Sequence, residues 1–201
     1  MEEKGIKIIL LGDSGVGKTN LINVLFDNNF EVNNNSTHNC YYFEGEINYK
    51  NKNYMYNVWD TAGQEQYRSL NRLFVKYAKI VICVYAIDFK ESFKSMEFWI
   101  NYVKETLGEG NYILGLIGNK SDLFEKQEVL DEEGEEFAKK NNMKFKITSA
   151  LTDSKGFKNY VNELINEYLE LYGENEDNTK NDSFKVHKMK TKKVTKTNCC
   201  E

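Results

Sequence analysis

Gly-Asp-Ser-Gly-Val-Gly-Lys-Thr occupies residues 12–19, directly after an apolar run from Ile6 to Leu11. Glycines at these places let successive backbone N–H groups curl inward around a polyphosphate, and a helix that starts here presents its positive end to the same charge. Lys18 supplies an ammonium for the β- and γ-phosphates, and the hydroxyl of Thr19 is a ligand for Mg²⁺. The pattern therefore predicts a phosphate-binding loop for a nucleoside triphosphate rather than a bare strand-to-helix corner. Its predicted nucleotide contacts are Ser14, Gly15, Val16, Gly17, Lys18, Thr19 and Asn20.

The composition favours one domain followed by a basic tail. A chain of 201 residues can bury one sizeable core, and its hydrophobic content of 40% is ordinary for a globular domain. The net charge of −4 conceals an asymmetry, because residues 180–201 hold seven lysines against two acidic residues, which leaves −9 on residues 1–179. Neither a secretory signal pattern nor an apolar run of about 18 residues occurs, so we expect a cytosolic body. In that reducing setting the four cysteines do not predict a disulfide framework.

The hydrophobic pattern predicts an α/β fold with a mainly parallel sheet between helices. Short apolar runs typical of central strands are Ile6 to Leu11, Ile80 to Tyr85 and Ile113 to Ile117. Helical spacing links Phe93, Met96, Ile100, Val103 and Leu107, and later Phe157, Val161, Leu164, Ile165, Tyr168, Leu169 and Tyr172. Tyr41 to Tyr49 and Asn53 to Trp59 are typical of an antiparallel hairpin, and Met143 to Ile147 is strand-like. We expect a domain over residues 1–172 and a flexible tail over residues 173–201.

Asp60-Thr61-Ala62-Gly63-Gln64 follows the second strand of the predicted hairpin. A carboxylate at the carboxyl end of a strand lies where open α/β sheets bind ligands, so Asp60 can hold Mg²⁺ directly or through water. Gly63 gives a backbone N–H access to the γ-phosphate, and Gln64 has a donor and an acceptor with which to orient an attacking water. Alone this segment is equally typical of an ordinary turn, but the phosphate-binding loop upstream favours the catalytic interpretation.

Asn119-Lys120-Ser121-Asp122 follows the apolar strand at Ile113 to Ile117. A carboxylate there accepts two hydrogen bonds from N1–H and the 2-amino group of guanine, which adenine lacks, so the predicted base is guanine. Taken alone the segment is a weak signal, and the prediction depends on its position after the other motifs. Thr148-Ser149-Ala150 follows the next strand, and a backbone N–H of this loop is predicted to reach the guanine O6.

Over residues 5–172, these motifs resemble the small GTPases of the Ras superfamily in order and spacing. The resemblance implies a P-loop GTPase fold, or G domain, with a six-stranded sheet, one antiparallel edge strand and helices on both faces. It further implies that Thr37 is the switch I threonine, which closes on Mg²⁺ and the γ-phosphate, and that Phe30 stacks against guanine. Without the resemblance, the composition of this segment would indicate only that Thr37 is a hydroxyl-bearing residue in a polar loop.

Gly12 to Thr19, Trp59 to Glu65 and Glu91-Ser92-Phe93 are most similar to the Rab branch of that superfamily. Rab proteins carry an effector-reading aromatic triad at the positions of Tyr42, Trp59 and Phe74. The alternative is that these three residues are core aromatics.

The chain departs from the Rab pattern at three places. The segment His38 to Tyr42 replaces the sequence that usually follows the switch I threonine, which puts the identity of the effector in doubt. Ala86 stands where Rab strands usually carry aspartate. Leu151 replaces a lysine that commonly lies over the base, and apolar packing of Leu151 on guanine is expected to alter affinity rather than specificity.

Cys199-Cys200-Glu201 ends the chain behind a run of lysines. This resembles the doubly geranylgeranylated ends of Rab proteins, whereas the Ras and Rho pattern needs a cysteine where Asn198 stands. Two prenyl chains supply the two apolar anchors that stable membrane attachment requires, and the lysines favour an anionic leaflet. The alternative is a disordered tail with two idle thiols. Binding of nucleic acid is not expected, because aromatics do not interleave the lysines and the body is acidic.

The combined interpretation is a Rab-like switch that hydrolyses GTP to GDP and phosphate and recruits effectors in vesicle-mediated transport. Lys18 and Gln64 are the predicted catalytic residues, Thr19, Thr37 and Asp60 the Mg²⁺ ligands. Intrinsic turnover is expected to be slow, because the motifs hold no obvious arginine finger. The resemblance also implies an exchange factor, a GTPase-activating protein, a GDP-dissociation inhibitor, a monomeric G domain and residence on the cytoplasmic face of an endomembrane, cycling with the cytosol. The rivals are a P-loop kinase acting on a small molecule, a scaffold that holds GTP without hydrolysing it and a small GTPase of another branch, such as a Ras-like signalling protein.

Overall fold

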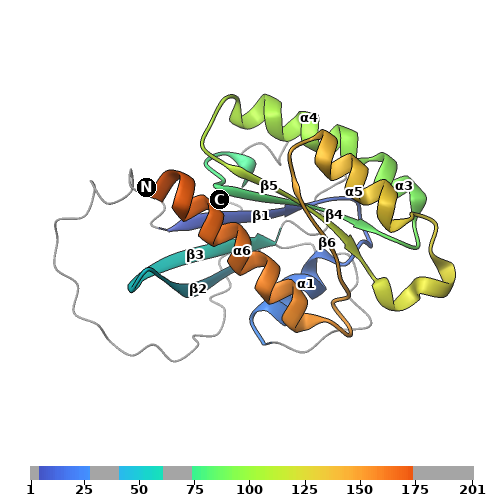
Figure 1. Ribbon diagram of the computed structural model, residues 1–201, viewed down its shortest axis with the longest axis horizontal. Helices are drawn as coiled ribbons and strands as arrows, with labels where there is room; N and C mark the ends of the chain where they lie inside the picture. Colours follow the sequence, from blue (N-terminus) through green and yellow to red (C-terminus); the bar gives the residue numbers. More distant parts are fainter. Residues whose placement is uncertain (1–4, 28–40, 61–73, 174–201) are drawn as a thin grey trace, which may run out of the picture.

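A computed structural model describes residues 5–27, 41–60 and 74–173 (Figure 1). The strands are β1 (Ile6–Leu11), β2 (Tyr41–Tyr49), β3 (Lys52–Asp60), β4 (Ile80–Ala86), β5 (Ile113–Asn119) and β6 (Lys144–Ile147). The helices are α1 (Lys18–Leu25), α3 (Lys90–Lys94), α4 (Met96–Leu107), the 3₁₀ helix η2 (Ser121–Lys126), α5 (Asp131–Lys140) and α6 (Ser154–Tyr172).

The six strands form one sheet in the order β2-β3-β1-β4-β5-β6. β1 runs parallel to β3 and β4, and β5 runs parallel to β4 and β6. Only β2, at the edge, is antiparallel, and it pairs with β3 over its whole length. The predicted α/β fold with one antiparallel edge strand is therefore confirmed. Because five strands are parallel, their carboxyl ends meet at one edge of the sheet, where ligands bind in open α/β folds.

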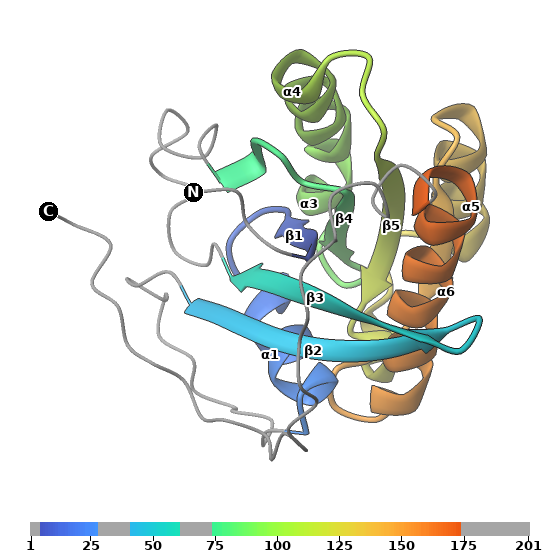
Figure 2. The same ribbon diagram turned by 90° about the vertical axis from the view of Figure 1, so that its left-hand side faces the viewer.

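Helices cover both faces of the sheet (Figure 2). Successive residues of a strand supply opposite faces. In β1, Ile8 and Leu10 join a buried cluster with side chains of α1 and α6. Ile9 and Leu11 join a second cluster with side chains of α4 and α5. This explains why the central strands read as continuous apolar runs rather than as alternating ones.

The hairpin has the predicted strands, with β3 one residue longer at each end than the sequence pattern suggested. Lys50 and Asn51 form its turn with φ of 48° and 63°, the left-handed pair that matches the twist of two antiparallel strands. The added residue at the end of β3 is Asp60, which pairs with Tyr41 in the register of the hairpin. The carboxylate predicted to bind metal is thus held by the sheet itself.

The helical pattern from Phe93 to Leu107 is not one helix. It divides at Ser95 into α3 and α4, and the hydroxyl of Ser95 donates to the carbonyl of Glu91 at 3.1 Å. Such a bond to the previous turn bends or interrupts a helix. Helix α5 was not predicted, because only Gly134 and Ala138 of its ten residues are buried and an apolar stripe is absent. Its first turn is acidic, which favours a helix start.

Helix α6 ends at Tyr172, where the sequence predicts the domain to end. The predicted tail, with Cys199 and Cys200, lies outside the described residues, as do Phe30, Thr37, Gly63 and Gln64. Among the described helices, none is long and apolar enough to cross a bilayer.

Candidate nucleotide-binding site

The loop after β1 has the curled backbone that a phosphate-binding loop requires. Gly12 and Gly17 adopt φ of 148° and 95°, which side chains rarely permit. A methyl group on Gly12 would lie 2.1 Å from the carbonyl oxygen of Val84, and one on Gly17 would lie 2.4 Å from Nδ2 of Asn119. The neighbouring strands therefore press closely on this loop, and α1 begins at its end.

Lys18 is folded back over the loop from the first turn of α1. Its ammonium donates to the carbonyl oxygens of Gly12 at 2.8 Å and Asp13 at 2.9 Å, and only 4% of the residue is exposed. The positive charge is therefore concentrated inside the loop, where the sequence predicts the β- and γ-phosphates to bind.

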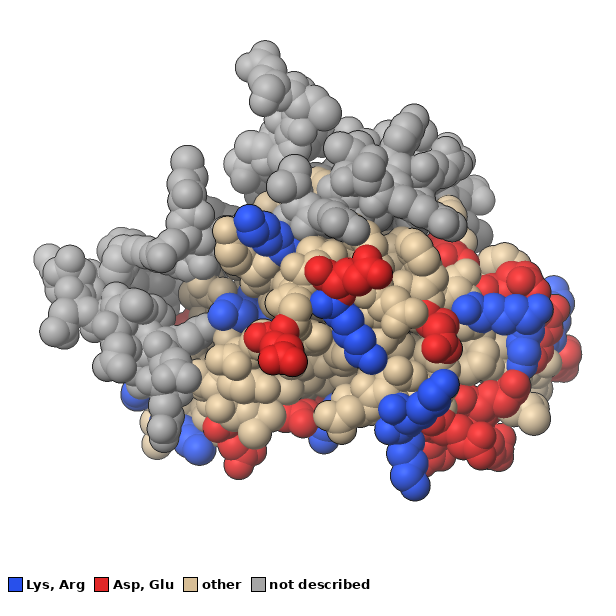
Figure 3. Space-filling view, turned by 90° about the horizontal axis from the view of Figure 1, so that it is seen from above, with Lys and Arg blue, Asp and Glu red and all other residues tan. Residues whose placement is uncertain are grey.

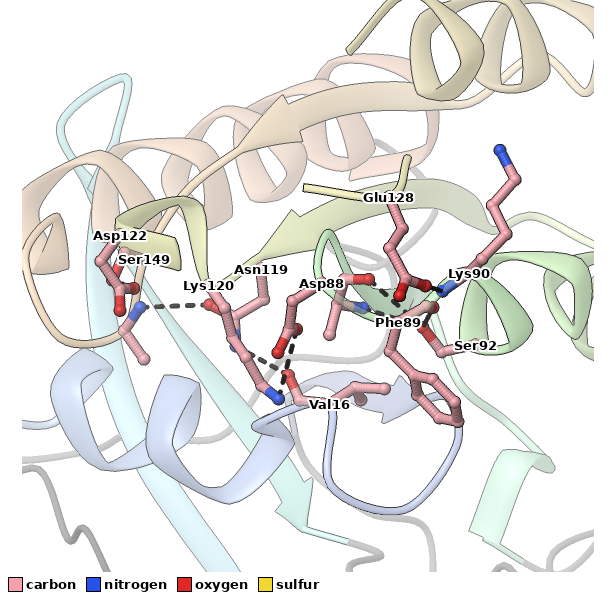
Figure 4. A network of polar contacts seen from close by, with 12 residues as sticks. Val16, Asp88, Phe89, Lys90, Ser92, Asn119, Lys120, Asp122, Glu128 and Ser149 are labelled. Atoms are coloured by element: carbon pink, nitrogen blue, oxygen red, sulfur yellow. Dashed lines mark hydrogen bonds and ion pairs between the residues drawn. The ribbon is translucent and has the colours of Figure 1, made fainter. Parts of the chain in front are cut away.

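Asn119, the last residue of β5, joins three segments that are far apart in the chain (Figure 4). Its Nδ2 donates to the carbonyl oxygen of Val16 at 2.7 Å, and its Oδ1 accepts from the backbone N–H of Ala150 at 3.1 Å. Asn119 is fully buried, so both bonds are made away from water. The phosphate-binding loop, the Asn119–Asp122 segment and the Ser149 loop are thus brought together, as predicted. Of the backbone N–H groups in the loop predicted to approach the base, that of Ala150 is engaged by Asn119.

Ser149 orients the carboxylate predicted to recognise guanine. The buried hydroxyl of Ser149 donates to Oδ1 of Asp122, and it accepts from the backbone N–H groups of Leu151 at 3.0 Å and Thr152 at 3.2 Å. The hydroxyl proton is therefore directed at the carboxylate. Leu151 itself is 55% exposed beside this loop, available for apolar contact with a ligand.

Lys120 has a partner that the sequence did not suggest. Its backbone is left-handed, with φ of 67°, and its ammonium lies 3.5 Å from Oδ1 of Asp88 (Figure 4). Asp88 stands two residues after the end of β4, and Ser92 braces this turn by accepting from the N–H of Ala86 at 3.1 Å. An acidic residue at the carboxyl end of a parallel strand is the signal that would have identified Asp88. The family position of an aspartate is occupied by Ala86, and a carboxylate recurs two residues later.

Asp60 and Thr19 supply the donor chemistry that Mg²⁺ prefers. Asp60 is 1% exposed at the end of β3, beside the strand that leads into the loop, and Thr19 is the second residue of α1. A carboxylate and a hydroxyl make an oxygen-only set, which fits a hard cation. Across the described residues, groups of three or more His, Cys, Asp and Glu suited to a metal do not occur. The predicted ligand set of Thr19, Thr37 and Asp60 does not depend on such a group, because phosphate oxygens of a bound nucleotide would complete it.

The three aromatics predicted to read effectors lie in contact. The rings of Tyr42 and Trp59 have centroids 5.2 Å apart on paired strands, and those of Trp59 and Phe74 are 6.1 Å apart. Tyr42 is 37% exposed, whereas Trp59 and Phe74 are half-buried. The ammonium of the buried Lys7 lies over the Trp59 ring, 4.7 Å from its centroid, and this cation–π contact stabilises the position of the ring.

Residues 7–170 match the Ras family. This chain belongs to that family. Its relatives include the Ras-related proteins Rab-11B and Rab-2B of Dictyostelium discoideum and the GTP-binding protein ypt3 of Schizosaccharomyces pombe. The identity to Rab-11B is 40% over 160 residues, which cover 80% of this chain and 72% of the relative. The identity to Rab-2B is 37%, covering 73% and 72%, and that to ypt3 is 36%, covering 74% and 69%.

These matches identify the chain as a small GTPase of the Rab branch and confirm the interpretation drawn from its motifs. As a Ras-family member it is a GTP-hydrolysing enzyme, and as a Rab-like one it functions as a switch in vesicle-mediated transport. The rival interpretations as a metabolic kinase or a passive scaffold are not favoured.

Proposed function

We propose that this Ras-family chain binds guanine nucleotide between the loop at residues 12–19 and the segments at 119–122 and 149–151. The observation that carries the proposal is the pair of hydrogen bonds by which Asn119 links Val16 and Ala150. A ligand that contacts all three segments would be held at both ends, with phosphates at Lys18 and the base at Asp122. The hydroxyl of Ser149, aimed at Asp122, supports the carboxylate in the orientation that two donors of guanine require.

Thr19 and Asp60 are the residues proposed to hold Mg²⁺, together with Thr37. Bound Mg²⁺ would neutralise the charge that develops on the β- and γ-phosphates during hydrolysis. Lys18, held inside the loop by two carbonyls, presents a further positive charge to the same oxygens. Gln64 orients the water that attacks the γ-phosphorus in line, and the bond to the β–γ bridging oxygen breaks to release GDP and phosphate. Contacts from Thr37 and Gly63 to the γ-phosphate are lost with it, which releases the switch segments.

The proposed membrane attachment depends on Cys199 and Cys200. Two prenyl chains, together with the net charge of +5 on residues 180–201, would hold the G domain at the cytoplasmic face of an anionic endomembrane. In this scheme the contiguous rings of Tyr42, Trp59 and Phe74 form the effector surface, and exchange factors, activating proteins and a GDP-dissociation inhibitor act on a monomeric G domain. Lysines and acidic side chains are interspersed over the described part of the face in Figure 3, which supports the expectation that nucleic acid is not a partner.

Nucleotide competition tests the proposal most directly. Purified protein is loaded with a fluorescent GDP and then mixed with an excess of an unlabelled nucleotide. GDP or GTP should displace the fluorescent GDP, whereas ATP should not. Asp122→Asn should weaken the binding of GTP and strengthen the binding of xanthosine triphosphate. In xanthine a carbonyl replaces the 2-amino donor of guanine, and the amide of asparagine can donate to that carbonyl. Asp131→Asn, the same change at an exposed position on α5, is the matched control. Equal competition by ATP and GTP in the unmodified protein would refute the assignment of the site.

A further inference from the structure

Trp99 reaches from α4 to the phosphate-binding loop. Its indole Nε1 donates to Oδ1 of Asp13 at 3.0 Å, across 86 positions of sequence. Only 3% of Trp99 is exposed, so its N–H has to find an acceptor within the protein. Its acceptor, Asp13, is the one acidic residue of the loop at residues 12–19.

The indole is oriented by α4 and the sheet rather than by the loop. Trp99 belongs to the buried cluster that includes Leu11 of β1 and Ile100 of α4. Its ring also makes edge contacts with Phe98 and Tyr102, at centroid distances of 5.3 and 6.2 Å. Because the indole is fixed in this way, the carboxylate of Asp13 has to lie on the α4 side of the loop to accept its hydrogen bond.

Asp13 is held at two points. Its own carbonyl oxygen accepts from the ammonium of Lys18 at 2.9 Å, and its carboxylate accepts from Trp99. Helix α1, into which the loop leads, lies on the opposite face of the sheet from α4. The bond from Trp99 therefore directs the carboxylate toward the α4 side, while the loop backbone continues through Gly17 to α1. A carboxylate that turned toward bound phosphates would repel them.

We propose that Trp99 is a positioning residue for nucleotide retention, which acts by holding the Asp13 carboxylate away from the phosphates. The inference rests on the proposed function, because it assumes that the loop at residues 12–19 holds them. It adds a residue from outside the nucleotide-binding motifs to the set that determines how long GDP and GTP stay bound. It also couples α4 to the shape of the loop.

Release of a fluorescent GDP into excess unlabelled GDP tests the proposal. Trp99→Phe keeps an aromatic ring in the cluster and removes only the N–H donor. We expect release about 10-fold faster than from the unmodified protein, the lower end of what loss of a hydrogen bond to a charged group produces. Glu97→Gln, at an exposed position in the first turn of the same helix, is the control and should leave the release rate unchanged.

A double-mutant cycle separates positioning from a general loss of packing. If Trp99 acts through the carboxylate, Trp99→Phe should accelerate release in the unmodified protein and have no further effect in Asp13→Ala. A merely structural role would accelerate release equally in both backgrounds and lower the melting temperature of the GDP complex in both. Either equal acceleration or an unchanged rate in Trp99→Phe alone overturns the proposal.

Tryptophan emission supplies an independent signature. Trp59 and Trp99 are the two tryptophans of the chain, so Trp59→Phe leaves Trp99 as the single emitter. We expect its emission to change when EDTA strips the nucleotide, and to change less in the presence of Asp13→Ala; an equal change in both would count against the coupling. If the unmodified protein retains no guanine nucleotide, the proposed function fails. If it retains GDP and Trp99→Phe releases it at the same rate, only this inference fails.

Discussion

The side-chain amide of Asn119 donates to the carbonyl oxygen of Val16 at 2.7 Å, joining two motifs that are 103 positions apart. The contact is possible because β5 and β1 both run parallel to β4, so their carboxyl ends lie at the same edge of the sheet. A methyl group on Gly17 would lie 2.4 Å from the same amide nitrogen. The loop at residues 12–19 and the Asn119–Asp122 segment are therefore one packed unit.

Replacing Asn119 should weaken nucleotide binding and the fold together. Asn119→Ala leaves a buried carbonyl at Val16 and a buried N–H at Ala150 without their partner, at about 1–3 kcal/mol each. We expect the Kd for GDP, measured by isothermal titration calorimetry, to rise at least about 30-fold, which corresponds to ~2 kcal/mol. The control Asn141→Ala removes an asparagine that bonds to the carbonyl of Phe137 at the far edge of the sheet. Unchanged affinity in Asn119→Ala would contradict the role given to this residue.

The ion pair of Lys120 and Asp88 should contribute modestly to retention of nucleotide. Both side chains are partly exposed, so the pair is screened by salt and is of the kind that contributes about 0–1 kcal/mol. Asp88→Asn should accelerate GDP release by about 2- to 5-fold in 50 mM salt and by less in 500 mM salt. Glu91→Gln, which disrupts the exposed pair of Glu91 and Lys94, should have no effect. An effect that is the same at both salt concentrations would argue against an electrostatic cause.

Gln64→Leu should slow hydrolysis without preventing binding. Leucine has neither the donor nor the acceptor needed to orient water, so single-turnover hydrolysis of bound GTP is expected to fall about 10-fold or more. GDP affinity should remain within about 2-fold, because the change removes a contact needed in the transition state only. Equal hydrolysis rates in the two proteins would rule out the assignment of Gln64.

Removal of both tail cysteines should separate membrane binding from nucleotide binding. Cys199→Ser with Cys200→Ser abolishes the sites of the two proposed lipid anchors, and one chain or none gives only marginal attachment. The double variant is expected in the supernatant of fractionated cells and to bind GDP normally. Cys83→Ser, at a cysteine buried in β4, controls for loss of a thiol. If the double variant still sediments with membranes, the lipid hypothesis fails.

Gly134→Ala should destabilise the domain from a position outside the nucleotide site. A methyl group there would lie 2.5 Å from the hydroxyl of Tyr85 and 2.6 Å from the ring of Phe145. Overpacking of this kind costs about 1–3 kcal/mol, measurable as a lower midpoint of urea unfolding in saturating GDP. Burial, together with the nearby carboxylates Asp131 and Glu133, raises the pKa of Tyr85, so its hydroxyl is neutral at every pH at which the urea unfolding is measured. Tyr85→Phe should partly rescue Gly134→Ala, and a failure to do so would locate the strain at Phe145 alone.

The sequence by itself determined the chemistry and the local elements. Residues 12–19, Asp60 and the Asn119–Asp122 segment carry their donors and acceptors whatever surrounds them. Continuous apolar runs located β1, β4 and β5, and the helical period located α6. These patterns are local, so they can be recognised from neighbouring residues of the sequence alone. The acidic helix α5 was missed by the sequence analysis, because so few of its residues face the core that they leave no apolar period.

Only the tertiary structure decided which side chains meet. The order of the strands in the sheet, which periodicity does not encode, brings Val16, Asn119 and Ala150 together and places Asp88 beside Lys120. The contact of Trp99 with Asp13 has the same origin, since α4 packs over the end of β1 although 86 positions separate the two residues. Partners distant in sequence are fixed by how whole elements pack, because burying both faces of the sheet leaves few arrangements open.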